Sequence, residues 1–130
     1  MNETAVEGIL KYVFNDKSLL RRALTHPSFF TERHENYQKL EFLGDSILDF
    51  VVAEYLYQEY SDKTEGDLTK MRASVVSKDA LSDLVKEMGL DKYAYVGRAQ
   101  GVMSAKMSSD VYEAVVAAIY LDGGLESVRT

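Results

Sequence analysis

The feature that most constrains the fold is a continuous run of helix-forming residues, from Asn36 or Tyr37 to about Tyr60, that is apolar on almost every side. Placed on a helix at about 100° per residue, its apolar side chains cover most of the circumference. They include Phe42, Leu43, Ile47, Leu48, Phe50, Val51, Val52 and Leu56. Because such a helix must be covered by other elements, the run predicts a central helix around which the rest of the chain packs.

The remaining pattern predicts further helices and no sheet. Helix formers dominate and strand-like alternation is scarce. Asp16 is placed to cap a helix that THP at 25–27 ends, and Thr64 is placed to cap another. A further helix is expected from about Lys78 to Gly89, since glycine commonly ends helices. We therefore expect an all-α domain.

The C-terminal part of the chain holds a second apolar helix. It is expected to start at Ser108 or Ser109 and to end at 122–124, DGG. Residues 93–107 carry two glycines and no clear period, so we expect a loop there. The final residues, LESVRT, match the first turns of one more helix.

Composition narrows the class of protein. The chain has 130 residues, 46% of them hydrophobic, with one proline and no cysteine. This is enough for one domain with its own core, and it excludes a disulfide framework or a thiolate metal site. No apolar run reaches the roughly 20 residues that a membrane helix needs, and the N-terminus lacks a signal-peptide layout. We expect a single domain over residues 1–130, soluble and cytoplasmic.

The negative charge is concentrated in two segments. The formal net charge is −6, which by itself argues against nucleic acid as a partner. Residues 41–62 contain six acids and residues 110–126 contain four, with no Lys or Arg in either segment. The rest of the chain is therefore mildly basic. The two acidic segments need cations or solvent, whereas the remainder could face phosphates.

Two pairs of acids stand near the start of the two apolar helices. Asp45 lies about 40° from Glu41 around the first helix, and Glu113 lies about 60° from Asp110 around the second. If the helices pack together, four carboxylates meet at one end, and they repel one another unless they are protonated or neutralised. Sites made of carboxylates favour hard ions such as Mg²⁺ or Mn²⁺. The alternative is that each pair is solvated, as paired acids on one helix face usually are.

Four blocks of the sequence carry a family resemblance. They are LTHPSF (24–29), KLEFLGDSIL (39–48), TEGDLTKMRASVVS (64–77) and SDVYEAVVAAIYLDGG (109–124). In this order they resemble the blocks of the ribonuclease III family of double-strand-specific endoribonucleases, and the likeness spans roughly residues 8–128. The resemblance implies an all-helical endonuclease domain that acts as a homodimer on double-stranded RNA.

The resemblance also implies a chemistry and roles for residues. With Mg²⁺, or Mn²⁺ in its place, the family leaves 5′-phosphate and 3′-hydroxyl ends with short 3′ overhangs, in RNA processing such as rRNA maturation. Its metal ligands and catalytic acids correspond to Glu41, Asp45, Asp110 and Glu113, with Glu113 expected to be the most catalytic. Phe42 corresponds to a residue that packs across the dimer axis; an ordinary core phenylalanine is the alternative. Glu65 corresponds to an ancillary acid near the centre, which the partner subunit could supply; a solvated acid in a first helical turn is the alternative.

Some residues depart from the family pattern. Gln38 stands where many bacterial members have an acid, the loop GRAQGVMSAKMSS is shorter than usual, and Ser109 replaces a common alanine. Full-length bacterial members usually continue into a double-stranded-RNA-binding domain, which these 130 residues do not contain. We expect the chain to be an excised nuclease domain or a short form.

Several other motifs favour structure over chemistry. His26 is expected to be a structural hydrogen-bonding residue, and Gly44 is expected to allow close approach of another helix. The tyrosine-rich run AEYLYQEY (53–60) is expected to serve the core and an interface. The candidates for phosphate contacts are Lys70, Arg72, Arg98 and Lys106.

Two other functions stay open. One is a catalytically silent RNA-binding or ribosome-associated scaffold of the same fold, against which the presence of all four acids argues. The other is a metal-dependent hydrolase of small phosphate compounds, because carboxylates alone do not select RNA. A nuclease assay distinguishes the silent scaffold from an endonuclease. Competition between duplex RNA and mononucleotides distinguishes the small-phosphate hydrolase from an endonuclease.

Overall fold

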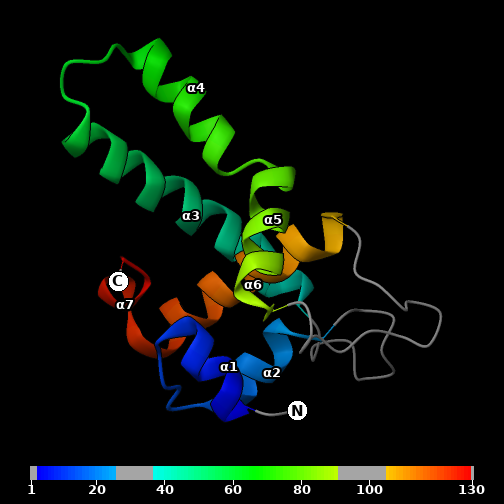
Figure 1. Cartoon of the computed structure of the whole chain (residues 1–130). Coiled ribbons are helices and arrows are strands. Elements are labelled where there is room, and N and C mark those ends of the chain that lie inside the picture. The colour runs from blue at the N-terminus through cyan, green and yellow to red at the C-terminus, as the bar shows by residue number, and fades with distance from the viewer. Residues whose placement is uncertain (1–2, 26–36, 91–104, 130) are drawn as a thin grey trace.

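The computed structural model describes residues 3–25, 37–90 and 105–129 (Figure 1). The regular structure of these residues consists of α-helices, which confirms the predicted all-α class. The helices are α1 (Glu3–Leu10), α2 (Lys17–Ala23), α3 (Gln38–Glu59), α4 (Glu65–Val75), α5 (Lys78–Met88), α6 (Ala105–Gly123) and α7 (Leu125–Arg129). None of the helices in these residues is long and apolar enough to span a membrane.

The core forms where α6 passes between the other helices (Figure 1). α6 packs against α3 along the most extensive helix pairing in the structure, and α2, α5 and α7 also contact it. Its core side consists of small and branched side chains that are at most 3% exposed, namely Val111, Ala114, Val115, Ala117 and Ala118. Both predicted apolar helices therefore form the centre of the domain, since each buries its face against the other.

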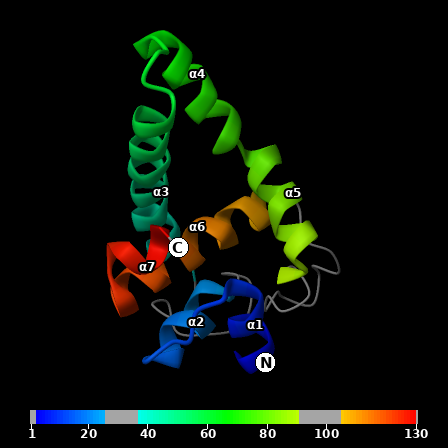
Figure 2. The same ribbon diagram turned by 60° about the vertical axis from the view of Figure 1, so that its left-hand side comes forward.

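The far half of α3 and the whole of α4 extend away from this core. In Figure 2 the two helices diverge from their connecting loop, and α5 continues from α4 back to α6. α4 has no fully buried residue, although it contacts α3. This part of the molecule is therefore a two-helix projection with much apolar surface left exposed on α3, including Tyr55 and Tyr57.

Local capping signals set several helix ends as the sequence predicts. The Asp16 carboxylate accepts a hydrogen bond from the Ser18 backbone N–H at 3.0 Å, and the Thr64 hydroxyl accepts one from the Asp67 N–H at 3.1 Å. Gly89 ends α5 with a φ of 78°, a left-handed conformation that glycine adopts at little cost.

Two features differ from the sequence predictions. The second apolar helix begins at Ala105 rather than at Ser108 or Ser109, so 105–107 belong to a helix and not to a loop. The extra turn carries Lys106, which forms an ion pair with Asp110. The N-terminal helix α1 had no counterpart among the predicted elements. Most of the predicted loop, 93–104, lies outside the described residues.

A network of carboxylates fastens the N-terminal helices to the end of α6. The Asp122 carboxylate accepts hydrogen bonds from the Tyr12 hydroxyl at 2.6 Å and from the backbone N–H groups of Asn15 at 2.9 Å and Asp16 at 2.8 Å. Nearby, the Lys17 ammonium pairs with the Glu7 carboxylate at 2.6 Å. One carboxylate at the end of α6 thus anchors the connection between α1 and α2.

Candidate metal centre

Three of the four predicted acids come together where α3 crosses α6. Glu41 lies on α3, and Asp110 and Glu113 lie one turn apart on α6. One carboxylate oxygen of each lies within 4.8 Å of the others. Asp110 is buried, whereas Glu41 and Glu113 are partly exposed, so the cluster sits at the edge of the core with an open side.

The close crossing of the two helices depends on Gly44. A Cβ atom built on Gly44 would collide with the backbone carbonyl of Glu113. Gly44 lies between Glu41 and Asp45 in the sequence, so this close contact of the helices is level with the acids. The predicted role of Gly44 in close helix approach is confirmed, and it places the α3 acids beside those of α6.

The start of α3 is held in place by Tyr37. The Tyr37 backbone N–H donates a hydrogen bond to the Thr25 carbonyl at 3.0 Å, and the Tyr37 side chain is 3% exposed. Burial raises the pKa of the Tyr37 hydroxyl, and the charges of Asp110 and Glu41 raise it further. Tyr37 therefore forms part of the wall of the cluster, a role that the sequence analysis did not predict.

The electrostatics of the cluster show a shortage of positive charge. Burial is the main cause that raises the pKa of Glu113 to about 8, and a hydrogen bond with Asp45 and the charges of Asp45, Glu41 and Asp110 add to it. Burial, followed by the charge of Asp110, also raises the pKa of Glu41. These are the shifts expected when carboxylates share a confined space without sufficient counter-charge.

Lys106 supplies part of that counter-charge. Its ammonium lies 2.8 Å from a carboxylate oxygen of Asp110. A hydrogen bond with Asp110 is the main cause that raises the pKa of Lys106. The two acidic segments contain no base, but Lys106, one helical turn before Asp110, supplies a positive charge from just outside the second segment.

The donor set fits a hard divalent ion. Oxygen ligands on opposite sides of Mg²⁺, each about 2.1 Å from the metal, lie about 4.2 Å apart, so oxygens within 4.8 Å need only a small adjustment. All three donors are carboxylates, which such ions prefer. Glu41, Asp110 and Glu113 would hold the ion, and the raised pKa of Glu113 shows that the site favours added positive charge.

The remaining predicted site residues lie around this cluster or away from it. Asp45 is exposed and lies outside the group of three, although it is hydrogen-bonded to Glu113. For Asp45 the solvated alternative applies, because its side chain is exposed. Phe42 is 80% exposed, so the alternative of an ordinary core phenylalanine is excluded. Its role in a dimer stays a prediction.

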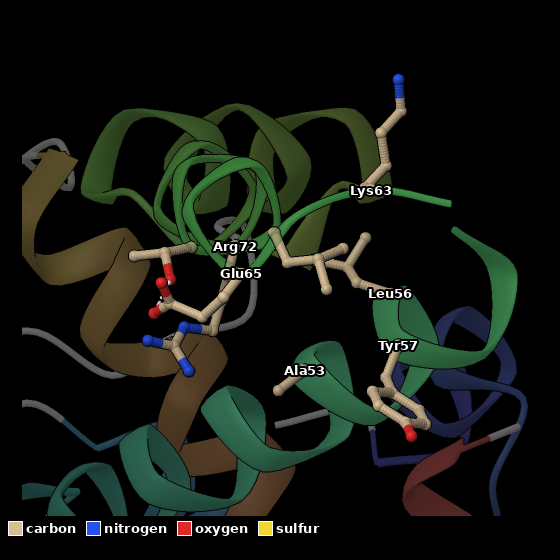
Figure 3. Close-up of a pocket in the computed structure, with 8 residues that line it drawn as sticks. Ala53, Leu56, Tyr57, Lys63, Glu65 and Arg72 are labelled. Atoms are coloured by element: carbon tan, nitrogen blue, oxygen red, sulfur yellow. Dashed lines mark hydrogen bonds between the residues drawn. The ribbon is translucent and has the colours of Figure 1, made fainter. Parts of the chain in front are cut away.

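Glu65 lies away from the cluster, in the first turn of α4. It accepts a hydrogen bond from the Thr69 hydroxyl at 3.2 Å. It lines an apolar pocket of about 400 Å³ between α3 and α4, together with Leu56, Tyr57 and Arg72 among others. In Figure 3, Glu65 and Arg72 extend from α4 towards α3, whereas Lys63 points away. Within one protomer, Glu65 is therefore not a ligand of the cluster.

Other predicted residues have no contact with the cluster or lie outside the described residues. His26 and Arg98 belong to the parts of the chain that are not described. Of the tyrosine-rich run, Leu56 is buried, while Tyr55 and Tyr57 are 56% and 75% exposed, so the tyrosines are not core residues of the protomer.

Comparison with known proteins gives a consistent set of relatives. A family model described as Ribonuclease-III-like matches residues 16–130. Proteins named Ribonuclease 3 from Bdellovibrio bacteriovorus and Rhodopirellula baltica are 43% and 47% identical, over 97% and 95% of this chain. Those alignments cover 57% and 47% of the two relatives, so the chain spans about half the length of the curated relatives it matches.

Solved structures are similar over nearly the whole chain. The nuclease domain of ribonuclease III from Campylobacter jejuni, described with structural flexibility in a region involved in dimer formation, superposes with a TM-score of 0.92 at 37% identity. That match covers 98% of this chain and 91% of the other. Dicer from Pichia stipitis matches with a TM-score of 0.66 at 31% identity, over 88% of this chain and 49% of Dicer.

Proposed function

Because the chain belongs to the ribonuclease III family, we propose that it is a Mg²⁺-dependent endonuclease that hydrolyses phosphodiester bonds of double-stranded RNA. The products would be 5′-phosphate and 3′-hydroxyl ends with short 3′ overhangs. The setting would be RNA processing in the cytoplasm, such as rRNA maturation. Mn²⁺ would serve in place of Mg²⁺.

The observation that carries this proposal is the meeting of Glu41, Asp110 and Glu113 at the crossing of α3 and α6. When bound, a hard dication supplies Lewis acidity that favours deprotonation of water and offsets negative charge on the phosphoryl oxygens. The three carboxylates would hold that ion. The open side of the cluster leaves room for a phosphate to approach.

The protein's own groups have distinct roles in this proposal. Asp110 is buried on α6, so its carboxylate has little freedom to move and would be a fixed ligand. The pKa of Glu113 is raised to about 8, so at neutral pH binding of a cation by both of its oxygens would release a proton. Asp45, which is hydrogen-bonded to Glu113 and exposed, would hold water at the rim of the site.

The proposed functional unit is a homodimer. The exposed apolar side chains of α3, among them Phe42 at 80% and Phe50 at 52% exposed, support this proposal, because exposed apolar surface of this kind often marks an interface. Glu65 would approach the metal centre only across such a dimer. Recognition of the duplex would depend on its A-form shape, 2′-hydroxyls and phosphates, so sequence specificity should be low.

The decisive experiment is incubation of the purified protein with long duplex RNA, first with Mg²⁺ and then with EDTA. We expect cleavage only with Mg²⁺, and end analysis should give 5′-phosphate and 3′-hydroxyl termini. Glu113→Gln should lower the cleavage rate by about 100-fold or more while circular dichroism stays unchanged. Glu87→Gln, on the exposed side of α5, is the matched control.

The same assay decides between the alternatives. Binding of duplex RNA without cleavage, under every metal tested, would indicate a silent scaffold. Hydrolysis of mononucleotides or other small phosphate esters in preference to duplex RNA would indicate a small-molecule hydrolase. Wild-type rates in Glu113→Gln would show that the catalytic residues are assigned wrongly.

A further inference from the structure

Lys106 occupies a position that the electrostatics of its own helix disfavour. It is the second residue of α6, and the first turn of that helix contains no acid. The N-terminus of a helix carries partial positive charge, which repels a cation. A lysine four residues before an acid is also the weaker of the two possible orders for such a pair. The reason for a lysine here must therefore lie outside the local needs of the helix.

The carboxylate cluster provides that reason. The Lys106 ammonium contacts Asp110, whose side chain is 11% exposed, while the Lys106 side chain itself is 74% exposed. The cation therefore approaches the cluster from its solvent side, along a flexible stem that is not packed into the core. The charges of Glu41 and Glu113 act on the same ammonium. Among the described residues, this is the basic side chain paired with an acid of the cluster.

We propose that Lys106 is a built-in counter-cation that competes with the divalent metal ion for Asp110 and so sets the ion concentration that the centre requires. In the metal-free protein its ammonium partly neutralises the carboxylates. A dication held by the same carboxylates repels the ammonium, which then moves out into solvent at little cost because its stem is exposed. The inference rests on the proposed metal centre, and it assigns Lys106 an effect on metal affinity rather than a catalytic role.

Calorimetric titration of the metal-free protein with Mn²⁺ tests this competition directly. The Lys106→Met variant keeps the length and helix propensity of the side chain but removes its charge. It should bind Mn²⁺ about three- to tenfold more tightly than the wild type, the modest size reflecting the exposure of the lysine. Lys106→Arg should stay near the wild-type Kd. Lys86→Met, on the exposed face of α5, should change nothing.

Thermal unfolding gives a second measurement that does not depend on activity. Without metal, Lys106→Met should lower Tm, because the carboxylates lose their counter-charge. With saturating Mn²⁺ the deficit should shrink or reverse, since tighter binding adds stability to the folded state. Lys106→Gln serves as the second neutral variant.

The outcomes separate this inference from the proposed function. Wild-type binding of Mn²⁺ with an equal or weaker affinity in both neutral variants overturns the role of Lys106 and leaves the nuclease proposal intact. Failure of the wild type and all variants to bind Mn²⁺, even with duplex RNA present, overturns both.

Discussion

Glu113 is the carboxylate with the least favourable surroundings for its charge. Burial and the neighbouring acids raise its pKa to about 8, while an unfolded chain would titrate near 4.3. Between these values the folded protein binds a proton that the unfolded chain has lost. The free energy of unfolding of the metal-free protein should therefore fall as the pH rises from about 5 to 8.

This prediction can be measured by urea unfolding in EDTA across that pH range. We expect a loss of about 1–2 kcal/mol, because water partly screens a half-exposed carboxylate. Glu113→Gln should flatten the dependence, while Glu87→Gln should keep it. A wild-type stability that rises over this range would contradict the assignment.

The same proton links pH to metal binding. Below pH 8 a cation must displace the proton of Glu113, so the apparent affinity for Mg²⁺ should rise with pH and level off above about 8. Calorimetry at pH 7 in buffers of different ionisation enthalpy should show release of about one proton per ion bound. Glu113→Gln should release none.

At the scale of elements, the spacing of α3 and α6 depends on a residue without a side chain. A methyl group at Gly44 would meet the carbonyl of Glu113, which is backbone and cannot rotate away. Gly44→Ala should therefore destabilise the fold by about 1–3 kcal/mol, the usual range for overpacking. It should also weaken Mn²⁺ binding by moving Glu41 away from Asp110.

Urea unfolding and Mn²⁺ titration of Gly44→Ala check both effects. Gly66→Ala is the matched control, since only the Thr64 hydroxyl oxygen lies within 4 Å of a Cβ built there. Unchanged stability and metal affinity in Gly44→Ala would show that the helices can separate without consequence for the centre.

The contact between the N-terminal helices and α6 also contributes measurably to the stability of the fold. Burial alone would raise the pKa of Asp122, but hydrogen bonds from Tyr12, Asn15 and Asp16 outweigh it and lower the pKa. The stabilisation is therefore present at neutral pH and lost as the pH falls through the lowered value. Asp122→Ala should cost about 1 kcal/mol at pH 7 and less at pH 3, measured by urea unfolding. Asp122→Asn, which keeps one acceptor oxygen, should lie between.

The elements differ in how well the sequence predicts them, because their signals act over different distances. Asp16, Thr64 and Gly89 act on groups within three residues, so their roles can be predicted from the sequence alone. The predicted start of α6 is later than the observed one, because a lysine in a first turn argues against a helix there. Its pairing with Asp110 exists only if residues 105–107 are already helical. The charges of Asp110, Glu41 and Glu113 stabilise Lys106 in this position.

The site was predictable in part for the same reason. Helical angles place Glu41 and Asp45 on one face, and Asp110 and Glu113 on another, but they do not give the height at which two helices cross. The crossing at Gly44 leaves Asp45 at the exposed rim. The Asp122 contacts join residues more than 100 positions apart. No local sequence pattern predicts the height of the helix crossing or these long-range contacts.

At the scale of the whole molecule, α3 leaves apolar side chains uncovered along its length. Phe42, Phe50 and Tyr57 are 80%, 52% and 75% exposed. Phe42→Asp should convert the proposed dimer into a monomer with an intact helical spectrum, as measured by analytical ultracentrifugation. Val13, which is 72% exposed between α1 and α2, provides the control Val13→Asp, and it should leave the dimer unchanged. An unaltered sedimentation coefficient in Phe42→Asp would remove Phe42 from the interface.

The tight crossing at Gly44 has a consequence for anyone who scans this protein by random mutagenesis. Activity scores from such a scan would rank this position beside the acids, although its side chain offers no donor, acceptor or charge. A list of functional residues based only on such scores would assign Gly44 a chemical role, although the position requires glycine only for steric reasons. Only a parallel readout of protein abundance or folding separates the two.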